Sequence, residues 1–225
     1  MTSEKGNNFD IDDLEDILNL DDYMENSESL LRGDSQLADY IYVNNLKQRK
    51  LYLDCDISFQ SVEDIIANIM NYNKSDKDIP TEERKPIYLY ISSLGGEVPA
   101  GLALMDVISS SKTPVYTINI GSAYSMAFYI AISGHKRYAL NNSTFLLHDG
   151  FNSLKLSVAK TQDVFQFQQK QEERLKQYTI SHTNITEKDY DGKYRAEWYM
   201  YADEAKELGV VDYIIGVDCD LDEIV

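Results

Sequence analysis

The sequence is poor in cysteine and has no long apolar run. Its 225 residues contain two cysteines, too few for a disulfide framework or a zinc site. No apolar run approaches the length of about 18 residues that a transmembrane helix needs. The acidic start, MTSEKGNNFDIDDLEDILNL, has neither the basic and apolar regions of a secretory signal nor the composition of a transit peptide. These absences predict a reducing, cytoplasmic location without a membrane span.

Basic residues are also scarce. Lysine and arginine number 21 against 38 acidic residues, which gives a net charge of −17. Residues 1–33 hold ten acids and two bases, residues 216–225 hold four acids and no base, and the 182 residues between them carry only −5. No basic patch is available to neutralise phosphates, which argues against nucleic acid or an anionic membrane as a partner.

The rest of the composition is that of a globular chain. With 43% hydrophobic residues, it can bury one core of ordinary domain size. We expect a folded domain over residues 36–216, followed by an acidic C-terminal tail at 217–225. The acidic N-terminal extension, 1–35, is interpreted either as a flexible segment or as a propeptide, docking arm or pore-lining segment.

Apolar patterns alternate between strand-like and helix-like stretches along the domain. They predict an α/β fold with a parallel sheet and right-handed crossovers. A mostly polar helix at about 157–183 is expected to project and pack on a partner. The predicted strands are 50–57, 87–92, 115–120, 145–147 and 210–215, and the other predicted helices are 61–72 (with Ser61 as N-cap and Met70 on the buried face), 98–109, 123–133 and 203–209.

Three short segments carry residues suited to acyl chemistry. His148 follows the apolar strand FLL, Gly95 and Gly96 follow another strand, and Ser122 and Ser125 lie where a strand gives way to a helix. Each has a simpler interpretation, as a turn histidine, a tight turn or a helix cap. Because ligands gather at the carboxyl ends of parallel strands, all three segments are predicted to face one cleft. The other two histidines lie in a turn and at the end of the polar helix.

Four stretches resemble the ClpP family, the proteolytic subunits of ATP-dependent Clp proteases. The similarity covers about 39–215 and implies a ClpP/crotonase-like fold of repeated β-β-α units, with the polar helix as a handle. The stretches are IYLYISSLGGEVPAGLALMDVI, GSAYSMAFYIAISG, NNSTFLLHDG and WYMYADEAKELGVVDYII.

The resemblance also implies a role for individual residues. Ser125 would be the nucleophile and His148 the general base, with the backbone N–H groups of Gly96 and Met126 as oxyanion donors. The third triad position, normally an aspartate, is Glu197 here, and Asp191 is the reserve candidate. Glu97 and Asp149 would belong to the substrate groove.

The sequence departs from the family pattern around the expected site. Leu94 replaces a proline, Ala127 a glycine and Trp198 an arginine of the ring-to-ring contacts, and Asp149-Gly150 replaces Gln-Pro. The glycine-rich strand that pairs with substrate becomes Phe151-Asn-Ser-Leu. We therefore expect altered substrate and ring interfaces.

The function implied is a serine endopeptidase that cleaves unfolded polypeptides without a metal or cofactor. It would work inside two stacked heptameric rings of this chain, with an AAA+ unfoldase of the Clp type as a possible partner. The alternatives are a catalytically impaired ring subunit, a viral ClpP-like capsid-maturation protease and, last, a crotonase-like acyl-CoA enzyme.

Overall fold

The computed structural model describes residues 34–150 and 158–224. The N-terminal extension up to residue 33 and the Phe151-Asn-Ser-Leu segment lie outside these residues. The chain forms two compact units that divide between Gln48 and Arg49. In the first unit the described element is helix α4, Asp34–Lys47, which was not among the predicted elements.

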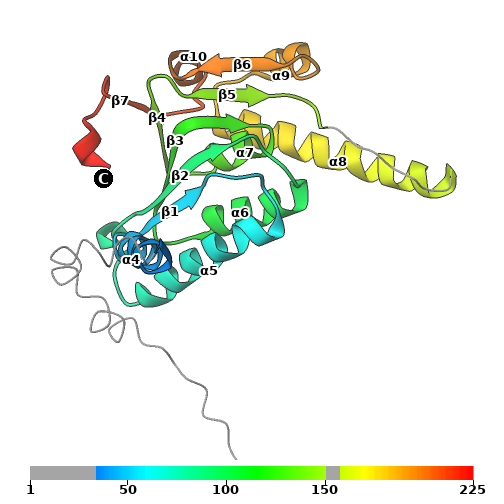
Figure 1. The fold of residues 1–225 in the computed structure, drawn as a ribbon. Coiled ribbons are helices and arrows are strands. Elements are labelled where there is room, and N and C mark those ends of the chain that lie inside the picture. The colour runs from blue at the N-terminus through cyan, green and yellow to red at the C-terminus, as the bar shows by residue number, and fades with distance from the viewer. Residues whose placement is uncertain (1–33, 151–157, 225) are drawn as a thin grey trace, which may run out of the picture. The chain divides into compact units, whose positions relative to one another are not determined.

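The second unit is built on one seven-stranded sheet (Figure 1). Its main path runs β1-β2-β3-β4-β7, and β5 pairs with the far half of β3 and with β6. Every pair is parallel except β5 and β6, so the predicted α/β fold with a parallel sheet is confirmed. The strands are β1 Lys50–Leu53, β2 Ile87–Ser93, β3 Val115–Tyr124, β4 Lys136–Leu140, β5 Thr144–Leu147, β6 Trp198–Tyr201 and β7 Tyr213–Ile215.

Strand β3 is the central strand and changes its partner along its length. Its first half pairs with β4, and its last residues pair with β5, while β2 lies on its other side. Ser93, Ala123 and Phe145 are thereby in register across three adjacent parallel strands. The segments that follow these strands must therefore emerge at the same edge of the sheet.

Helices α5, Phe59–Ser75, and α6, Val98–Ser110, lie together on one side of the sheet (Figure 1). The strand residues Ile87, Leu89 and Ile91, which alternate along β2, are fully buried. Alternate residues of a strand point to opposite faces, so β2 presents its tyrosines, Tyr88 and Tyr90, to the other face.

Helix α5 begins earlier than predicted. Its N-cap is Ser58 rather than Ser61, and the two residues form a reciprocal capping box, in which each side chain accepts a backbone N–H of the other. The buried face is the stripe Val62, Ile65 and Ile69, at helical spacings of three and four, and Met70 lies beside it rather than on it. Ile69 is fully buried, whereas Met70, which was predicted to be on that face, is 60% exposed.

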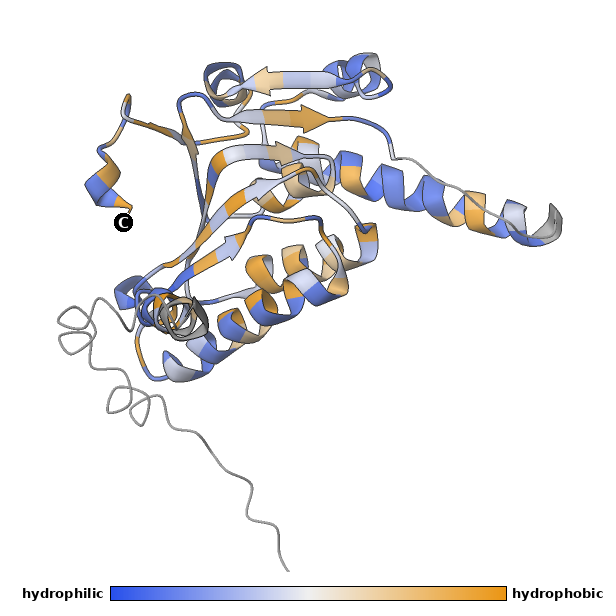
Figure 2. Cartoon of the chain, viewed as in Figure 1, coloured by the Kyte–Doolittle hydropathy of each residue, from blue (hydrophilic) through white to orange (hydrophobic). Residues whose placement is uncertain are grey.

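The polar helix is α8, Val158–His182, close to the predicted span. Figure 2 shows it as largely hydrophilic, with a few hydrophobic stretches. The remaining helices are α7 Met126–Ala131, α9 Glu187–Lys193, α10 Ala202–Glu207 and the short 3-10 turns at Thr81–Glu83 and Leu221–Glu223. Among the helices of the described residues, none is both long and apolar enough to cross a bilayer.

Candidate active site

Ser125 occupies a sharp turn between β3 and α7. Its backbone has φ 53° and ψ −122°, a region that residues other than glycine rarely adopt. The turn is held by the Ser125 N–H, which donates to the carbonyl of Leu146 at 2.9 Å on the neighbouring strand. The Ser125 side chain makes no capping hydrogen bond to α7. Capping, the simpler interpretation of this serine, is therefore not supported.

The glycine pair lies directly against this turn. A Cβ on Gly95 would stand 2.7 Å from the Cβ of Ser125 and 2.8 Å from the Tyr124 carbonyl oxygen, so only glycine allows this approach. Gly95 has φ 103° and Gly96 has φ 151°, both in the region that favours glycine. The close approach of Gly95 thus fixes the glycine turn against the Ser125 turn.

Two backbone amides near the serine are candidates for binding an anion. Ile57 forms a bridge to the glycine turn through the Gly95 carbonyl and the Glu97 N–H, which leaves the exposed Gly96 amide outside that bridge. Met126 is the first residue of α7, where an amide has no acceptor within its own helix. These are the two amides that the resemblance assigns to an oxyanion hole.

His148 follows β5, and Glu197 precedes β6. The two strands are antiparallel with Leu147 opposite Trp198, so the next residues on each strand face one another. The His148 Nδ1 lies 3.0 Å from the Glu197 Oε1. The histidine side chain is 25% exposed and that of the glutamate 58%. The pairing of β5 with β6 thus positions the two side chains, while the Glu197 side chain remains accessible to water.

The other candidates for acid–base roles are engaged elsewhere. Asp191, the reserve for the third position, lies on α9 and forms an ion pair with Lys176 at 2.8 Å. The Nδ1 of His135 accepts the Val115 N–H at 3.1 Å, so this turn histidine has a structural bond. His182 is the last residue of α8 and stacks on Tyr178.

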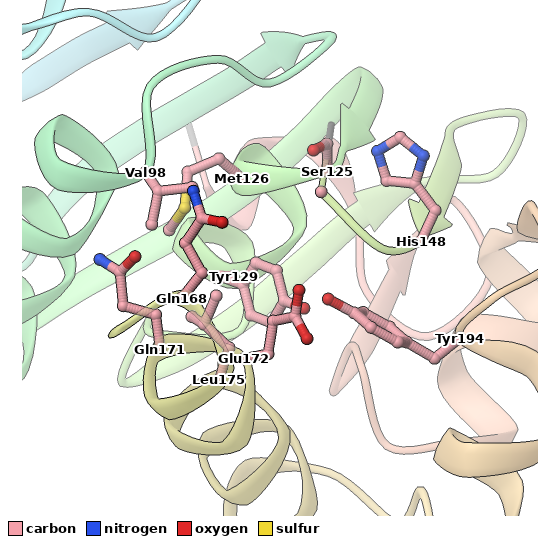
Figure 3. A pocket seen from close by; sticks show the side chains of 11 residues that line it. Val98, Ser125, Met126, Tyr129, His148, Gln168, Gln171, Glu172, Leu175 and Tyr194 are labelled. Carbon is pink, nitrogen blue, oxygen red and sulfur yellow. The ribbon is translucent and has the colours of Figure 1, made fainter. Parts of the chain in front are cut away.

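Ser125 and His148 line the same small cavity, of about 70 Å³ (Figure 3). Since Gly95 also packs against Ser125, the glycine turn, the Ser125 turn and the histidine segment meet at one edge of the sheet. The opposite wall comes from α8, which contributes Glu172 and Leu175 among others. The lining residues are Val98, Ser125, Met126, Tyr129, His148, Gly150, Gln168, Gln171, Glu172, Leu175 and Tyr194.

Sequence reasoning missed a group of three tyrosines at this cavity, of which Tyr129 and Tyr194 line it. The Tyr129 hydroxyl is 3.2 Å from that of Tyr190, and the Tyr190 and Tyr194 rings stack with centroids 4.7 Å apart. Burial raises the pKa of all three, to about 12 for Tyr194, so they remain neutral hydrogen-bonding groups at ordinary pH. The Tyr194 carbonyl also accepts the Asp149 N–H at 2.9 Å, which fixes the chain directly after His148.

The unusual residues are distributed around the site. Ala127 is fully buried and does not line the cavity, and Leu94 is 65% exposed beside the glycine turn. Trp198 is buried with the Lys193 ammonium 4.2 Å from its ring centroid. Glu97 and Asp149, expected in a substrate groove, are both exposed near the site but are not part of the cavity wall.

A family model described as Clp protease matches residues 33–218. The chain belongs to the Clp protease family. Among curated proteins it is similar to the ATP-dependent Clp protease proteolytic subunits of Dehalococcoides mccartyi strains BAV1 and CBDB1. Each is 31% identical over 190 residues, which cover 84% of this chain and 91% of the relative. Membership of the Clp protease family supports a peptide-hydrolysing function and agrees with the resemblance found in the sequence.

Proposed function

We propose that this chain is a serine endopeptidase of the ClpP type, with Ser125 as nucleophile. The observation that carries the proposal is the meeting of three groups in one place. Ser125, in a strained turn without a capping bond, shares a cavity with His148, whose Nδ1 is held by Glu197. A nucleophile, a base and a group that orients the base are the minimum for this chemistry.

The contact between His148 and Glu197 supports one direction of proton transfer. With its Nδ1–H donating to the Glu197 carboxylate, the imidazole has its lone pair on Nε2. Nε2 would take the proton of the Ser125 hydroxyl as Oγ attacks the peptide carbonyl. The resulting imidazolium would then protonate the leaving amine, and water would hydrolyse the acyl-enzyme by the same route.

The charge that develops on the carbonyl oxygen needs fixed donors. The Met126 amide directly follows Ser125, and Gly96 follows Gly95, which packs against Ser125; both amides would donate to this oxyanion. Donors of this kind contribute about 10²- to 10³-fold in rate, because they need no reorganisation as the charge forms.

Substrates would be unfolded polypeptides that reach the site within a chamber. Clp proteolytic subunits generally form rings and work with Clp ATPases, and two exposed phenylalanines of α8, Phe165 and Phe167, suit a contact between rings. We propose two stacked heptameric rings of this chain, fed by an AAA+ unfoldase.

A fluorophosphonate probe tests the nucleophile. We expect one covalent adduct, located on Ser125 by peptide mass mapping, in protein shown by native mass spectrometry to be assembled. Ser125→Ala should abolish the adduct, and Ser122→Ala, a serine of the same turn region that does not line the cavity, should leave it unchanged.

One observation favours a second candidate, a catalytically impaired ring subunit. The Glu197 carboxylate that orients His148 is largely exposed, so water competes for it. An assembled ring that forms no adduct and cleaves no unfolded protein would reject the peptidase proposal and support this subunit role.

A further inference from the structure

The cavity beside Ser125 has an apolar wall and a polar wall. Close to Ser125 the wall is apolar, with the buried side chain of Met126 and the half-buried side chain of Val98. The opposite wall, from α8, contains two glutamines and Glu172 (Figure 3). A substrate side chain that enters beside Ser125 therefore contacts apolar surface before it reaches polar groups.

Glu172 supplies a negative charge to this cavity. Among the described residues that line it, Glu172 is the only acid, and none is a lysine or arginine. In Figure 3 its carboxyl group lies toward the hydroxyl ends of Tyr129 and Tyr194. Burial raises the pKa of both tyrosines, and the charge of the Glu172 carboxylate raises each of them further. Because a charge has this effect at close range, the carboxylate is directed toward the cavity.

The Glu172 carboxylate has no cationic partner of its own. Lys176 lies one turn further along α8, at a spacing where a lysine commonly pairs with a glutamate. Its ammonium instead pairs with Glu187 at 2.9 Å and with Asp191 at 2.8 Å. Within the part of the chain that the structure describes, no lysine or arginine forms an ion pair with Glu172. Glu172 is also exposed, so a group that enters the cavity can reach it.

The surroundings of the cavity add further negative charge. Glu97 follows the glycine turn, Asp149 follows His148, and both are exposed. The Glu197 side chain, which contacts the His148 ring, is exposed as well. Charges of one sign around a cleft raise the local concentration of ligands of the other sign. The site therefore favours a positively charged substrate group.

The proposed mechanism indicates which substrate residue enters the cavity. The carbonyl under attack would be held by the Met126 amide, and Met126 also lines the cavity. The residue that carries this carbonyl, the one before the cleaved bond, therefore places its side chain there. A volume of about 70 Å³ holds about five water-sized groups, which suits one long side chain. Lysine and arginine combine an aliphatic stem with a cationic end, so they match the apolar wall and the carboxylate in turn.

We propose that Glu172 is a specificity-determining residue, which makes this cavity select lysine or arginine before the cleaved bond. Its carboxylate would accept hydrogen bonds from the ammonium or guanidinium group, while the stem of that side chain packs on Met126 and Val98. An uncharged side chain would leave the carboxylate unpaired. This inference rests on the proposed peptidase function and deepens it, because it names the class of peptide bond that is cleaved.

The test compares two fluorogenic peptides that differ in the residue before the cleaved bond. One has lysine there, and the other has norleucine, which keeps the aliphatic stem and lacks the ammonium group. We expect kcat/KM to be about tenfold higher for the lysine peptide, which is the effect of a hydrogen bond between charged groups in a partly exposed site. Glu172→Gln should reduce this ratio by about tenfold, because an amide carries no charge to attract the ammonium.

Glu173→Gln is the matched control. It removes the same charge from the next residue of α8, which is exposed and does not line the cavity, so the preference for lysine should persist. Ser125→Ala should abolish cleavage of both peptides, which excludes a contaminating protease. Mass-spectrometric mapping of fragments from an unfolded protein gives a second measurement. Cleavage should concentrate after lysine and arginine with the intact chain but not with Glu172→Gln.

Labelling of Ser125 by the fluorophosphonate probe separates two kinds of failure. If Ser125 is labelled but lysine is not preferred, or if the preference survives in Glu172→Gln, the inference is overturned and the peptidase proposal stands. If the assembled chain forms no adduct and cleaves neither peptide, the peptidase proposal is rejected, and selection of substrates by Glu172 is rejected with it.

Discussion

At the scale of single residues, the proposed chemistry depends on which ring nitrogen of His148 is left to accept a proton from Ser125. Glu197 holds Nδ1, but a glutamate is one methylene longer than the aspartate usual in the family. The antiparallel pairing of β5 and β6 compensates, because it places residue 197 opposite residue 148 and lets the longer side chain reach Nδ1 at 3.0 Å. The Glu197 side chain is 58% exposed, so water screens its interaction with the imidazole more than it would screen that of a buried acid.

Glu197→Gln tests this role. Glutamine keeps the shape but removes the charge that stabilises the imidazolium, so we expect kcat for a fluorogenic peptide to fall about 10²-fold with little change in KM. Glu63→Gln, an exposed glutamate on α5, is the control and should be neutral. An unchanged kcat would show that His148 works without Glu197.

At the scale of secondary-structure elements, regular apolar patterns made most of the fold predictable. The buried strands and the helices that cover them were placed from these patterns, to within a few residues. Strands β4 and β6 were missed, because KRYAL and WYMY are short and carry charged or exposed aromatic residues. Without β6 the antiparallel pairing could not be predicted, and Glu197 entered only through the resemblance.

One ion pair joins three elements. The guanidinium of Arg49, just before β1, donates two hydrogen bonds of 2.6 Å to Asp76, the C-cap of α5. The Thr113 hydroxyl, before β3, donates a third at 2.9 Å. These bonds lower the pKa of the Asp76 carboxyl, and the one from Arg49 has the largest effect. Burial acts in the opposite direction and raises this pKa.

Asp76→Asn should reduce the free energy of unfolding by about 3 kcal/mol at pH 7, because it leaves Arg49 without its ion-pair partner. A carboxyl with a lowered pKa stabilises the fold above its ordinary pKa, and this stabilisation is lost as the pH falls through the lower, folded-state pKa. The difference between the two proteins, measured by urea unfolding, should therefore shrink toward pH 2. The control is Asp78→Asn, since Asp78 is exposed. A difference that does not change with pH would contradict the ionic explanation.

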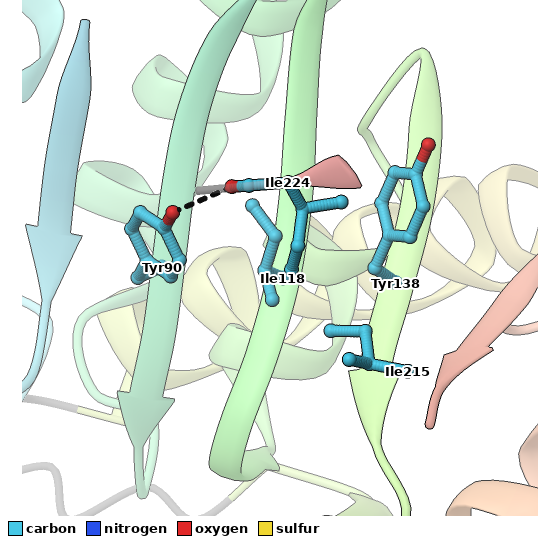
Figure 4. Packing of buried hydrophobic residues seen from close by; sticks show 5 residues of the cluster. All are labelled: Tyr90, Ile118, Tyr138, Ile215 and Ile224. Atoms are coloured by element: carbon cyan, nitrogen blue, oxygen red, sulfur yellow. Dashed lines mark hydrogen bonds between the residues drawn. The ribbon is translucent and has the colours of Figure 1, made fainter. Parts of the chain in front are cut away.

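At the scale of the whole molecule, the sequence predicted that the three site segments meet, but not which other residues line the cavity around them. The three site segments follow adjacent strands, so chain order and parallel pairing were enough to bring them together. One wall of the cavity contains Glu172 of α8 and Tyr194, which follows α9. Long-range packing of this kind leaves no local pattern in the sequence. Ile224 is 2% exposed and packs in a cluster with Tyr90 and Tyr138 (Figure 4). It was missed for the same reason, since an acidic tail gives no sign that one isoleucine is buried.

The proposed stacking of rings requires that exposed apolar side chains of α8 be covered by the other ring. Phe165 and Phe167 are 57% and 60% exposed, and phenylalanines in a polar helix cost solubility unless a partner covers them. Phe165→Ser with Phe167→Ser should therefore separate stacked rings and halve the mass in native mass spectrometry, while circular dichroism stays the same. Gln166→Ser with Gln169→Ser, on the same helix, is the matched control. If the full mass persists in the phenylalanine variant, the rings are not joined through these side chains, and the exposed pair must have another partner.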